Sequence, residues 1–278
     1  MKLVAAPKWI KPTAWSVGTR CSRTPVRVFF MEIGKMIELN RIYNEDCLEG
    51  MKRIPDASVD CIICDLPYGT TQNKWDSIIP FEPLWEQYHR IAKENAAIVL
   101  FGAEPFSSTL RLSNLNDYKY DWIWDKSQVT GFLNAKKQPL RQHETISVFY
   151  AKQCVYNPQM VKGKPQLKGT GGKTSNYGKF NLNPHISDDY YPKSVLKFPQ
   201  QRIKGGHPTQ KPVALIEYLI KPYTNEGETI LDNCMGSGTT AVAAIRTKRN
   251  FIGFELQKEY FDIANKRIKD EQQQLSLF

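Results

Sequence analysis

Four consecutive residues, Asp65-Leu66-Pro67-Tyr68, follow the apolar run VDCIIC and combine groups that could act on an amine. An exocyclic amine has two N–H donors, so a site that positions it needs two acceptors, which the Asp65 carboxylate and the Leu66 carbonyl could provide. Pro67 fixes φ and stiffens the turn, while Tyr68 offers a flat face on which an extruded base can stack. If the apolar run is a strand of an open α/β sheet, these residues lie at its carboxyl end, where such sheets bind ligands.

A glycine loop lies near the other end of the chain, in ETILDNCMGSGTTAVAAI. An apolar strand is predicted to end in Asp232, a Gly236-Ser237-Gly238 turn follows, and a helix is predicted to begin at about Thr239. Glycine permits positive φ and close backbone approach, and the amides at a helix start favour a polar or anionic group. Glu255, at the end of the next predicted strand, could accept hydrogen bonds from two ribose hydroxyls. The loop therefore indicates an adenosine cofactor, but it does not distinguish NAD from S-adenosylmethionine.

These residues need a scaffold, and the sequence predicts one from alternating strands and helices. The first half contains the predicted strands RIYNED, VDCIICDLPY, AAIVLFG, YKYDWIWDK and ETISVFY, with a short helix after RIYNED and helices over 82–95 and 105–115. The pattern returns with helices over 210–223, at TTAVAAIRTK and over 257–272, and with strands at TILDNC and FIGFEL. This alternation predicts an α/β fold with a doubly wound, mostly parallel sheet.

The periodicity disappears between 151 and 206, where Gly, Pro, Lys, Asn and Tyr dominate. Such a composition predicts a loop-rich insertion. The expected organisation is a non-core or disordered extension over 1–36, half of the α/β domain over 37–150, the insertion over 151–206, the other half over 207–272 and a tail over 273–278.

The net charge of +10 is unevenly distributed. Residues 126–211 contain fifteen Lys or Arg and three acids, and residues 1–31 contain six basic residues and no acid, so the remainder is net −8. A basic segment beside an acidic remainder predicts a surface for polyanions such as nucleic acid, and the alternative is a solvated lysine-rich loop. The candidate contacts are Trp75, Lys136, Lys137, Arg141, Lys162, Lys164, Lys168, Lys173 and Lys179.

Composition excludes several other classes of protein. Hydrophobic residues make up 41% and charged residues 24%, as in ordinary globular proteins, and no apolar run is long enough to cross a bilayer. We therefore expect a cytoplasmic protein with no membrane partner. The six cysteines show no framework spacing, and Cys61 and Cys64 lie in a predicted buried strand without further ligands nearby, so no metal site is expected. Trp122 and Trp124 are predicted to pack in the core, whereas His143 and Glu144 could contact phosphate or position a nucleic-acid strand.

The chain resembles the amino-DNA methyltransferases, whose hallmarks are (D/N/S)PPY/F and a glycine loop of the type DPFxGSGTT. The matching segments are DLPY at 65–68 and DNCMGSGTT at 232–240. Their order, with the insertion between them, resembles the β group, whose target-recognition region lies in that place. YNEDCLEGM at 43–51 and HPTQKP at 207–212 resemble the same group. The resemblance extends from about residue 38 to about residue 270.

The resemblance implies a Rossmann-like, circularly permuted methyltransferase sheet that binds S-adenosylmethionine, with the catalytic site at residues 65–68. The acid matching Asp46 would contact the adenine of the cofactor and Glu255 its ribose. The loop would lie against the methionine portion, with Asp232 orienting the loop. The remaining implied cofactor-binding residues are His207, Thr209, Lys211, Gly236, Ser237, Gly238 and Thr239.

This chain departs from the family pattern at three positions. Leu66 replaces the first proline of the tetrapeptide, which keeps the acceptor carbonyl but loosens the turn. Asn233 and Cys234 replace Pro and Phe ahead of the glycine loop, which removes an aromatic residue that helps to shape the cofactor pocket.

The implied activity is site-specific methylation of double-stranded DNA at N6 of adenine, by direct in-line transfer to a flipped base. Asp65 favours adenine, and N4 of cytosine is the alternative. Methylation at C5 of cytosine is disfavoured because the chain lacks the Pro-Cys dipeptide that usually carries the attacking thiolate. A nicotinamide oxidoreductase and an inactive DNA-binding protein are the alternatives of another class. The expected setting is a bacterial or phage cytoplasm, and the sequence leaves open a companion restriction nuclease and the choice between monomer and homodimer.

Overall fold

The computed structural model describes residues 37–70, 76–169, 172–174, 176, 178–180, 183–200 and 210–275. The strands of its main sheet are β1 (Arg41–Tyr43), β2 (Val59–Cys64), β3 (Ala92–Gly102), β4 (Tyr118–Thr130), β5 (Arg141–Phe149), β10 (Val195–Lys197), β11 (Thr229–Asp232) and β12 (Asn250–Phe254). The helices are α1 (Cys47–Met51), α2 (Phe81–Ile91), α3 (Phe106–Ser113), α4 (Val213–Tyr223), α5 (Thr239–Arg246) and α6 (Lys258–Leu275), with a short 3-10 helix at Phe132–Asn134.

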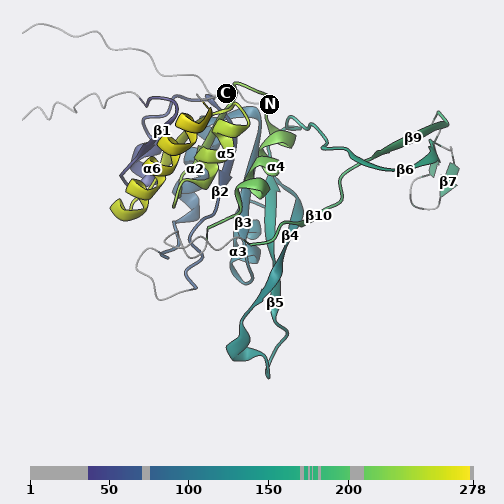
Figure 1. The fold of residues 1–278 in the computed structure, drawn as a ribbon, viewed down its shortest axis with the longest axis horizontal. Coiled ribbons are helices and arrows are strands. Elements are labelled where there is room, and N and C mark those ends of the chain that lie inside the picture. Colours follow the sequence, from purple (N-terminus) through teal and green to yellow (C-terminus); the bar gives the residue numbers. More distant parts are fainter. Residues whose placement is uncertain are drawn as a thin grey trace, which may run out of the picture. The chain divides into compact units, whose positions relative to one another are not determined.

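The main sheet has the strand order β1-β12-β11-β2-β3-β5-β4-β10 (Figure 1). All its neighbouring strands pair in parallel except β5, which is antiparallel to both β3 and β4. The predicted mostly parallel α/β sheet is therefore confirmed.

The central strands are apolar on both faces because each face is covered by helices. Along β2, the side chains of Cys61 and Ile63 pack into one core with α4, α5 and α6, whereas Ile62 and Cys64 pack into a second core with α1, α2 and α3. This alternation follows from the two-residue period of a strand. The sequence interpretation of Cys61 and Cys64 as buried strand residues is confirmed.

Two segments differ from their predicted secondary structure. The helix expected over 82–95 ends at Ile91, because Ala92 has φ −70° and ψ 139°, which is extended backbone, and pairs with Val59 at the start of β3. The segment over 151–206, expected to be loop-rich, contains β10 and two small hairpins. These hairpins are formed by β6 (Val161–Lys168) with β9 (His185–Tyr190), and by β7 (Gly172–Thr174) with β8 (Gly178–Phe180). The insertion thus returns one strand to the main sheet.

Residues 1–36 lie outside the described residues, so their role stays a prediction, as do the domain boundaries.

Trp122 and Trp124 are buried in the core, as expected. Within the described ranges, no helix is long and apolar enough to cross a membrane, and no group of three or more His, Cys, Asp and Glu side chains could hold a metal ion.

Candidate active site

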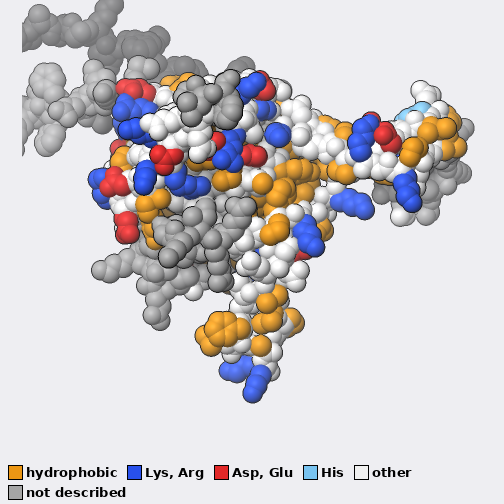
Figure 2. Space-filling view, in the orientation of Figure 1, with side chains coloured by type: hydrophobic (Ala, Val, Ile, Leu, Met, Phe, Trp, Pro, Cys, Tyr) orange, Lys and Arg blue, Asp and Glu red, His pale blue; other side chains and the backbone are white. Residues whose placement is uncertain are grey.

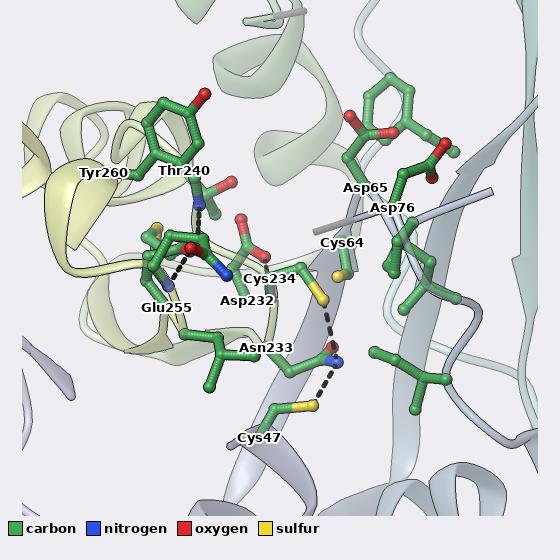
Figure 3. Close-up of a pocket in the computed structure, with 18 of the residues that line it drawn as sticks. Cys47, Cys64, Asp65, Asp76, Asp232, Asn233, Cys234, Thr240, Glu255 and Tyr260 are labelled. Carbon is green, nitrogen blue, oxygen red and sulfur yellow. Dashed lines mark hydrogen bonds between the residues drawn. The ribbon is translucent and has the colours of Figure 1, made fainter. Parts of the chain in front are cut away.

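A cavity of about 470 Å³ lies at the carboxyl ends of β2 and β11, the adjacent central strands. The helices that follow β11 and β12 cover one face of the sheet, and those that follow β2 and β3 cover the other, so a crevice opens between the two sets. The pocket connects the DLPY segment to the glycine loop. In Figure 3, Asp65 and Asp76 lie on one side, Glu255 and Tyr260 lie on the other, and Asp232 lies between them with the thiols of Cys64 and Cys234.

At one end of the pocket, hydrogen bonds and a ring contact hold the DLPY side chains. The Tyr68 hydroxyl donates to Asp65 Oδ1 at 2.7 Å, and its ring stacks on Phe106 with centroids 4.9 Å apart and an interplanar angle of 25°. Burial raises the pKa of Tyr68, and the carboxylates of Asp65 and Glu144 raise it further. The phenol therefore stays protonated and serves as a donor to Asp65.

The backbone after DLPY is tied to an acid that no sequence motif marked. The amides of Gly69 and Thr70 donate to the two carboxylate oxygens of Asp76 at 2.8 and 2.9 Å. Asp76 is 9% exposed and lines the pocket. It fixes the chain just beyond the tetrapeptide. Trp75, one of the candidate contacts to nucleic acid, lies outside the described residues.

Lys211 lies at the end of the pocket formed by the DLPY segment. Its ammonium contacts Asp65 Oδ2 and lies 3.5 Å from Glu144 Oε2. Burial lowers the pKa of Lys211, but the two carboxylates outweigh burial and the net change is upward. The resemblance placed Lys211 among the cofactor-binding residues; it lines the pocket, and its ammonium contacts the acid of the tetrapeptide. His207 and Thr209, of the same motif, lie outside the described residues.

Glu144 completes this charged cluster and was not expected inside a pocket. Its Oε1 lies 3.2 Å from Lys126 Nζ, and the Lys126 side chain is almost completely buried. Burial raises the pKa of Glu144, but the ammonium groups of Lys211 and Lys126 outweigh burial and hold it below its ordinary value. Glu144 is therefore an ionised, buried carboxylate.

The other end of the pocket carries two acids. Glu255 is 8% exposed and accepts backbone hydrogen bonds from Gly236 at 2.8 Å and from Gln257 at 2.7 Å, and burial raises its pKa. Asp46 caps the start of α1, with Oδ1 accepting from the amides of Leu48 and Glu49. A carboxylate has about four lone-pair sites, so both acids can still accept hydrogen bonds from a ligand.

The two glycines of the loop serve different purposes. Gly236 has φ +54°, and a Cβ built on it would meet no atom within 4 Å, although the residue lines the pocket. Gly238 has φ +82°, and a Cβ there would lie 2.9 Å from the Cβ of Ala264 in α6. Gly236 therefore leaves room for a ligand, whereas Gly238 permits the close approach of α6.

The hydroxyls of the loop bind protein groups. Ser237 Oγ donates to Gln210 Oε1 at 2.9 Å, and Arg267 Nη1 donates to Ser237 Oγ at 3.1 Å and to Thr239 Oγ1 at 3.4 Å. Arg267 comes from α6, so this helix braces the loop from behind. Ser237 and Thr239 line the pocket, but their hydroxyls have these partners in the protein.

Two residues before the loop, Asn233 and Cys234, stand where the family has proline and phenylalanine. Asp232 accepts from the Cys234 amide at 3.1 Å, and burial raises the pKa of Asp232 to about 6. Asn233 is buried; its Oδ1 accepts from the Tyr88 hydroxyl at 2.5 Å, and its Nδ2 lies 3.6 Å from the sulfur atoms of Cys47 and Cys234. Polar partners thus satisfy the amide that stands where the family has proline.

The size and the polar groups of this pocket fit an adenosine cofactor. Its volume falls within the range of about 300–1,000 Å³ that is typical of small-molecule sites. Glu255 and Asp46 provide carboxylates for hydroxyl or amino donors, and the backbone at Gly236 is open to a ligand.

The basic candidate residues lie outside this pocket. Lys136, Lys137 and Arg141 are exposed at the end of the β4–β5 hairpin, where Figure 2 shows basic and hydrophobic side chains together. The register places this end beyond the pocket edge of the sheet, since Thr145 pairs with Gly102 at the carboxyl end of β3 and β5 begins at Arg141.

The lysines of the insertion lie on the two small hairpins. Lys162 pairs with Asp188 and Asp189, and the ammonium of Lys168 lies 3.6 Å from the centroid of the Tyr190 ring. The other three are Lys164, which is exposed, and Lys173 and Lys179, whose backbones are paired in the β7–β8 register.

Comparison with known proteins gives the relatives of this chain. The model of the DNA methylase family, named for N6 and N4 methyltransferases, matches residues 59–266. The chain is 29% identical to the DNA adenine methyltransferase YhdJ of Escherichia coli (strain K12), over 83% of each protein. It is 28% identical to the type II methyltransferase M1.MboII of Moraxella bovis, over 83% of this chain and 96% of that protein. Its structure is similar to that of an M1.HpyAVI–SAM complex, with a TM-score of 0.55, 27% identity and coverage of 82% of this chain and 98% of the other.

Proposed function

The chain belongs to the DNA methylase family, and we propose that it methylates N6 of adenine in double-stranded DNA, at a specific site, with S-adenosylmethionine as methyl donor. The observation that carries the proposal is the juxtaposition of the DLPY segment and the glycine loop on one pocket. An amine-binding tetrapeptide alone or a glycine loop alone would be compatible with several functions. Their shared cavity is what a transfer between an adenosine cofactor and an amine requires.

The catalytic end would bind and orient the amine. The carboxylate of Asp65 and the carbonyl of Leu66 would accept its two N–H groups and stabilise the positive charge that builds on nitrogen. The Tyr68 hydroxyl fixes the Asp65 carboxylate, and Pro67 stiffens the turn that carries the carbonyl. Because alignment is the main requirement, this mechanism needs no covalent enzyme intermediate, and the proton passes to solvent after transfer.

The cofactor end would hold S-adenosylmethionine through residues that the structure gathers there. Glu255 would accept from the ribose hydroxyls and Asp46 from the adenine, while the backbone at Gly236 would hold the methionine portion. Asp232 orients this loop by binding the Cys234 amide. When bound, the cofactor supplies an electrophilic methyl on a sulfonium, which leaves as a neutral thioether.

Two features support adenine in DNA as the acceptor. Asp65 stands at the first position of the tetrapeptide, and the similar protein YhdJ is named a DNA adenine methyltransferase. The exposed cations of the β4–β5 hairpin would contact phosphates, together with those lysines of the insertion that are not paired with acids. The similarity to M1.MboII, a type II methyltransferase, supports the proposal that this protein acts together with a companion nuclease in a restriction-modification system.

Methyl transfer in vitro tests the proposal. Purified protein is incubated with unmethylated bacterial DNA and tritiated S-adenosylmethionine, and the nucleosides of the product are separated. We expect label in N6-methyl-2′-deoxyadenosine. Label in N4-methyl-2′-deoxycytidine would show that the target base is cytosine, and binding of NAD(P) without binding of S-adenosylmethionine would reject the function.

A further inference from the structure

Glu144 has no role in the function proposed so far, although it is a buried charge inside the pocket. Its Oε2 is completely buried and has no hydrogen-bond partner in the described part of the chain. The nearest cation is Lys211 Nζ at 3.5 Å, which is an ion pair but is longer than the 2.7–2.9 Å typical of a charge-assisted hydrogen bond. An unsatisfied buried carboxylate oxygen is costly and calls for an explanation.

A second observation concerns Asp65, which is expected to receive the target amine. Both of its oxygens already have partners: Oδ1 accepts from the Tyr68 hydroxyl and Oδ2 contacts the Lys211 ammonium. The Tyr68 ring is held by its stack on Phe106, whereas Lys211 has a long side chain and a second carboxylate beside it. Lys211 is therefore the partner that can leave Asp65.

We infer that Glu144 is a positioning residue, which receives the Lys211 ammonium from Asp65 when the target amine binds. This inference rests on the proposed function. The change exchanges hydrogen bonds without breaking a covalent bond: Lys211 closes on Glu144 Oε2, and Asp65 Oδ2 becomes free for an N–H of the amine. Because positive charge builds on the amine during transfer, moving a cation away from Asp65 also reduces repulsion in the transition state.

The surroundings of Lys211 allow such an exchange. Its ammonium lies 5.1 Å from the centroid of the Phe101 ring and 5.9 Å from that of Trp124, so these rings can stabilise the cation on either carboxylate. Lys126 binds the other oxygen of Glu144 at 3.2 Å, which leaves Oε2 for Lys211. The two acids and two lysines balance in charge, and the cluster stays neutral throughout the exchange.

The alternative is that Glu144 only anchors the start of β5 to the core. Glu144→Gln separates the two possibilities, because glutamine keeps the size of the side chain but cannot attract the ammonium. We expect kcat for methyl transfer to unmethylated bacterial DNA to fall about 10- to 100-fold, the effect of losing a hydrogen bond to a charged group. The KM values for DNA and cofactor should stay within about twofold of wild type, since the exchange occurs when the target amine reaches Asp65, after DNA and cofactor have bound.

Two further variants provide readouts that an anchoring role would not change. Glu144→Asp restores a carboxylate and should recover part of the kcat lost in Glu144→Gln. The double variant Glu144→Gln/Lys211→Met should turn over faster than Glu144→Gln, since no ammonium then occupies Asp65. Glu226→Gln serves as the matched control, because Glu226 is an exposed acid paired with Lys248 and should keep wild-type kinetics.

Each outcome decides for or against the exchange. Wild-type kcat in Glu144→Gln, a loss explained by raised KM values alone, or a double variant no faster than Glu144→Gln would overturn it. If Glu144→Gln does not fold, Glu144→Asp should show reduced kcat with unchanged KM values, and a wild-type kcat there would count against the exchange. Failure of the wild-type chain to methylate DNA would instead reject the proposed function.

Discussion

Two glycines of the loop, Gly236 and Gly238, can be compared with Gly227, which lies outside the loop. All three have positive φ, but they differ in what an added Cβ would meet. Gly227 and Gly236 have φ +83° and +54° with no atom within 4 Å of the Cβ position, whereas at Gly238 (φ +82°) the Cβ would lie 2.9 Å from Ala264 Cβ and 3.0 Å from its Cα. Substitution by alanine at each position therefore separates backbone strain from steric overlap and from intrusion into the pocket.

The expected losses follow from these environments. Left-handed backbone costs a non-glycine residue roughly 1–2 kcal/mol, which applies to all three variants. Overpacking against the backbone of α6 adds about 1–3 kcal/mol at Gly238. In a domain of this size about 1 kcal/mol shifts the Tm by roughly 2–4 °C. Gly227→Ala and Gly236→Ala should thus lower the Tm by about 2–8 °C, and Gly238→Ala by about 4–20 °C.

Cofactor binding distinguishes Gly227→Ala from Gly236→Ala, the two variants in which the added Cβ meets no other atom. The methyl group of Gly236→Ala would project into the pocket, so we expect its affinity for S-adenosylmethionine to fall at least tenfold by calorimetry, an effect of about 1.4 kcal/mol. Gly227→Ala, with the same backbone penalty away from the pocket, should bind as wild type. Equal affinity in these two variants, or a Gly238→Ala variant as stable as Gly227→Ala, would refute the reasoning.

Three further predictions concern catalysis, pH and DNA. Asp65→Ala should abolish methyl transfer yet largely spare cofactor binding, whereas Gly238→Asp should block both; equal loss of cofactor binding by calorimetry would contradict this division. The rise of the Asp232 pKa from 3.8 to about 6 corresponds to about 3 kcal/mol of preference for the protonated form. Stability is therefore lost as the pH rises from 3.8 to about 6, and the loss is complete above pH 6, so Asp232→Asn should raise the free energy of unfolding at pH 7.5 by up to that amount. This gain should vanish as the pH falls towards 4, which denaturant titrations at several pH values would check. Replacing Lys136 and Lys137 by alanine should reduce the slope of log affinity for DNA against log salt by about 1–2, and an unchanged slope in filter binding would remove them from the interface.

Local pattern predicted the parts of the fold that local physics determines. Strand β2 was recognisable because it is buried on both faces and so reads as a continuous apolar run that ends at Asp65. The glycine loop was recognisable because only glycine readily adopts the positive φ observed at Gly236 and Gly238. Both segments that line the pocket could therefore be predicted from the sequence alone.

Contacts between distant segments were beyond that reasoning. Lys211 and Asp65 are separated by 146 positions, and Glu144 reaches them only because β5 pairs with β3, the neighbour of the strand β2 that leads into the DLPY segment. Alternation of strands and helices does not determine this strand order, so Glu144 seemed to be a surface residue. Asp76 was missed for a related reason, because binding of two amides leaves no mark in the sequence.

The central claim is methyl transfer to an amino group of DNA at the DLPY segment, and single-molecule sequencing tests it most directly. DNA is taken from a host that expresses the wild-type chain and from one that expresses Asp65→Ala. The account predicts N6-methyladenine at the copies of one short motif in the first DNA and none in the second. N4-methylcytosine at that motif would show that the target base is cytosine and not adenine. DNA without a modified amine in either host, with folded protein present, would contradict the claim.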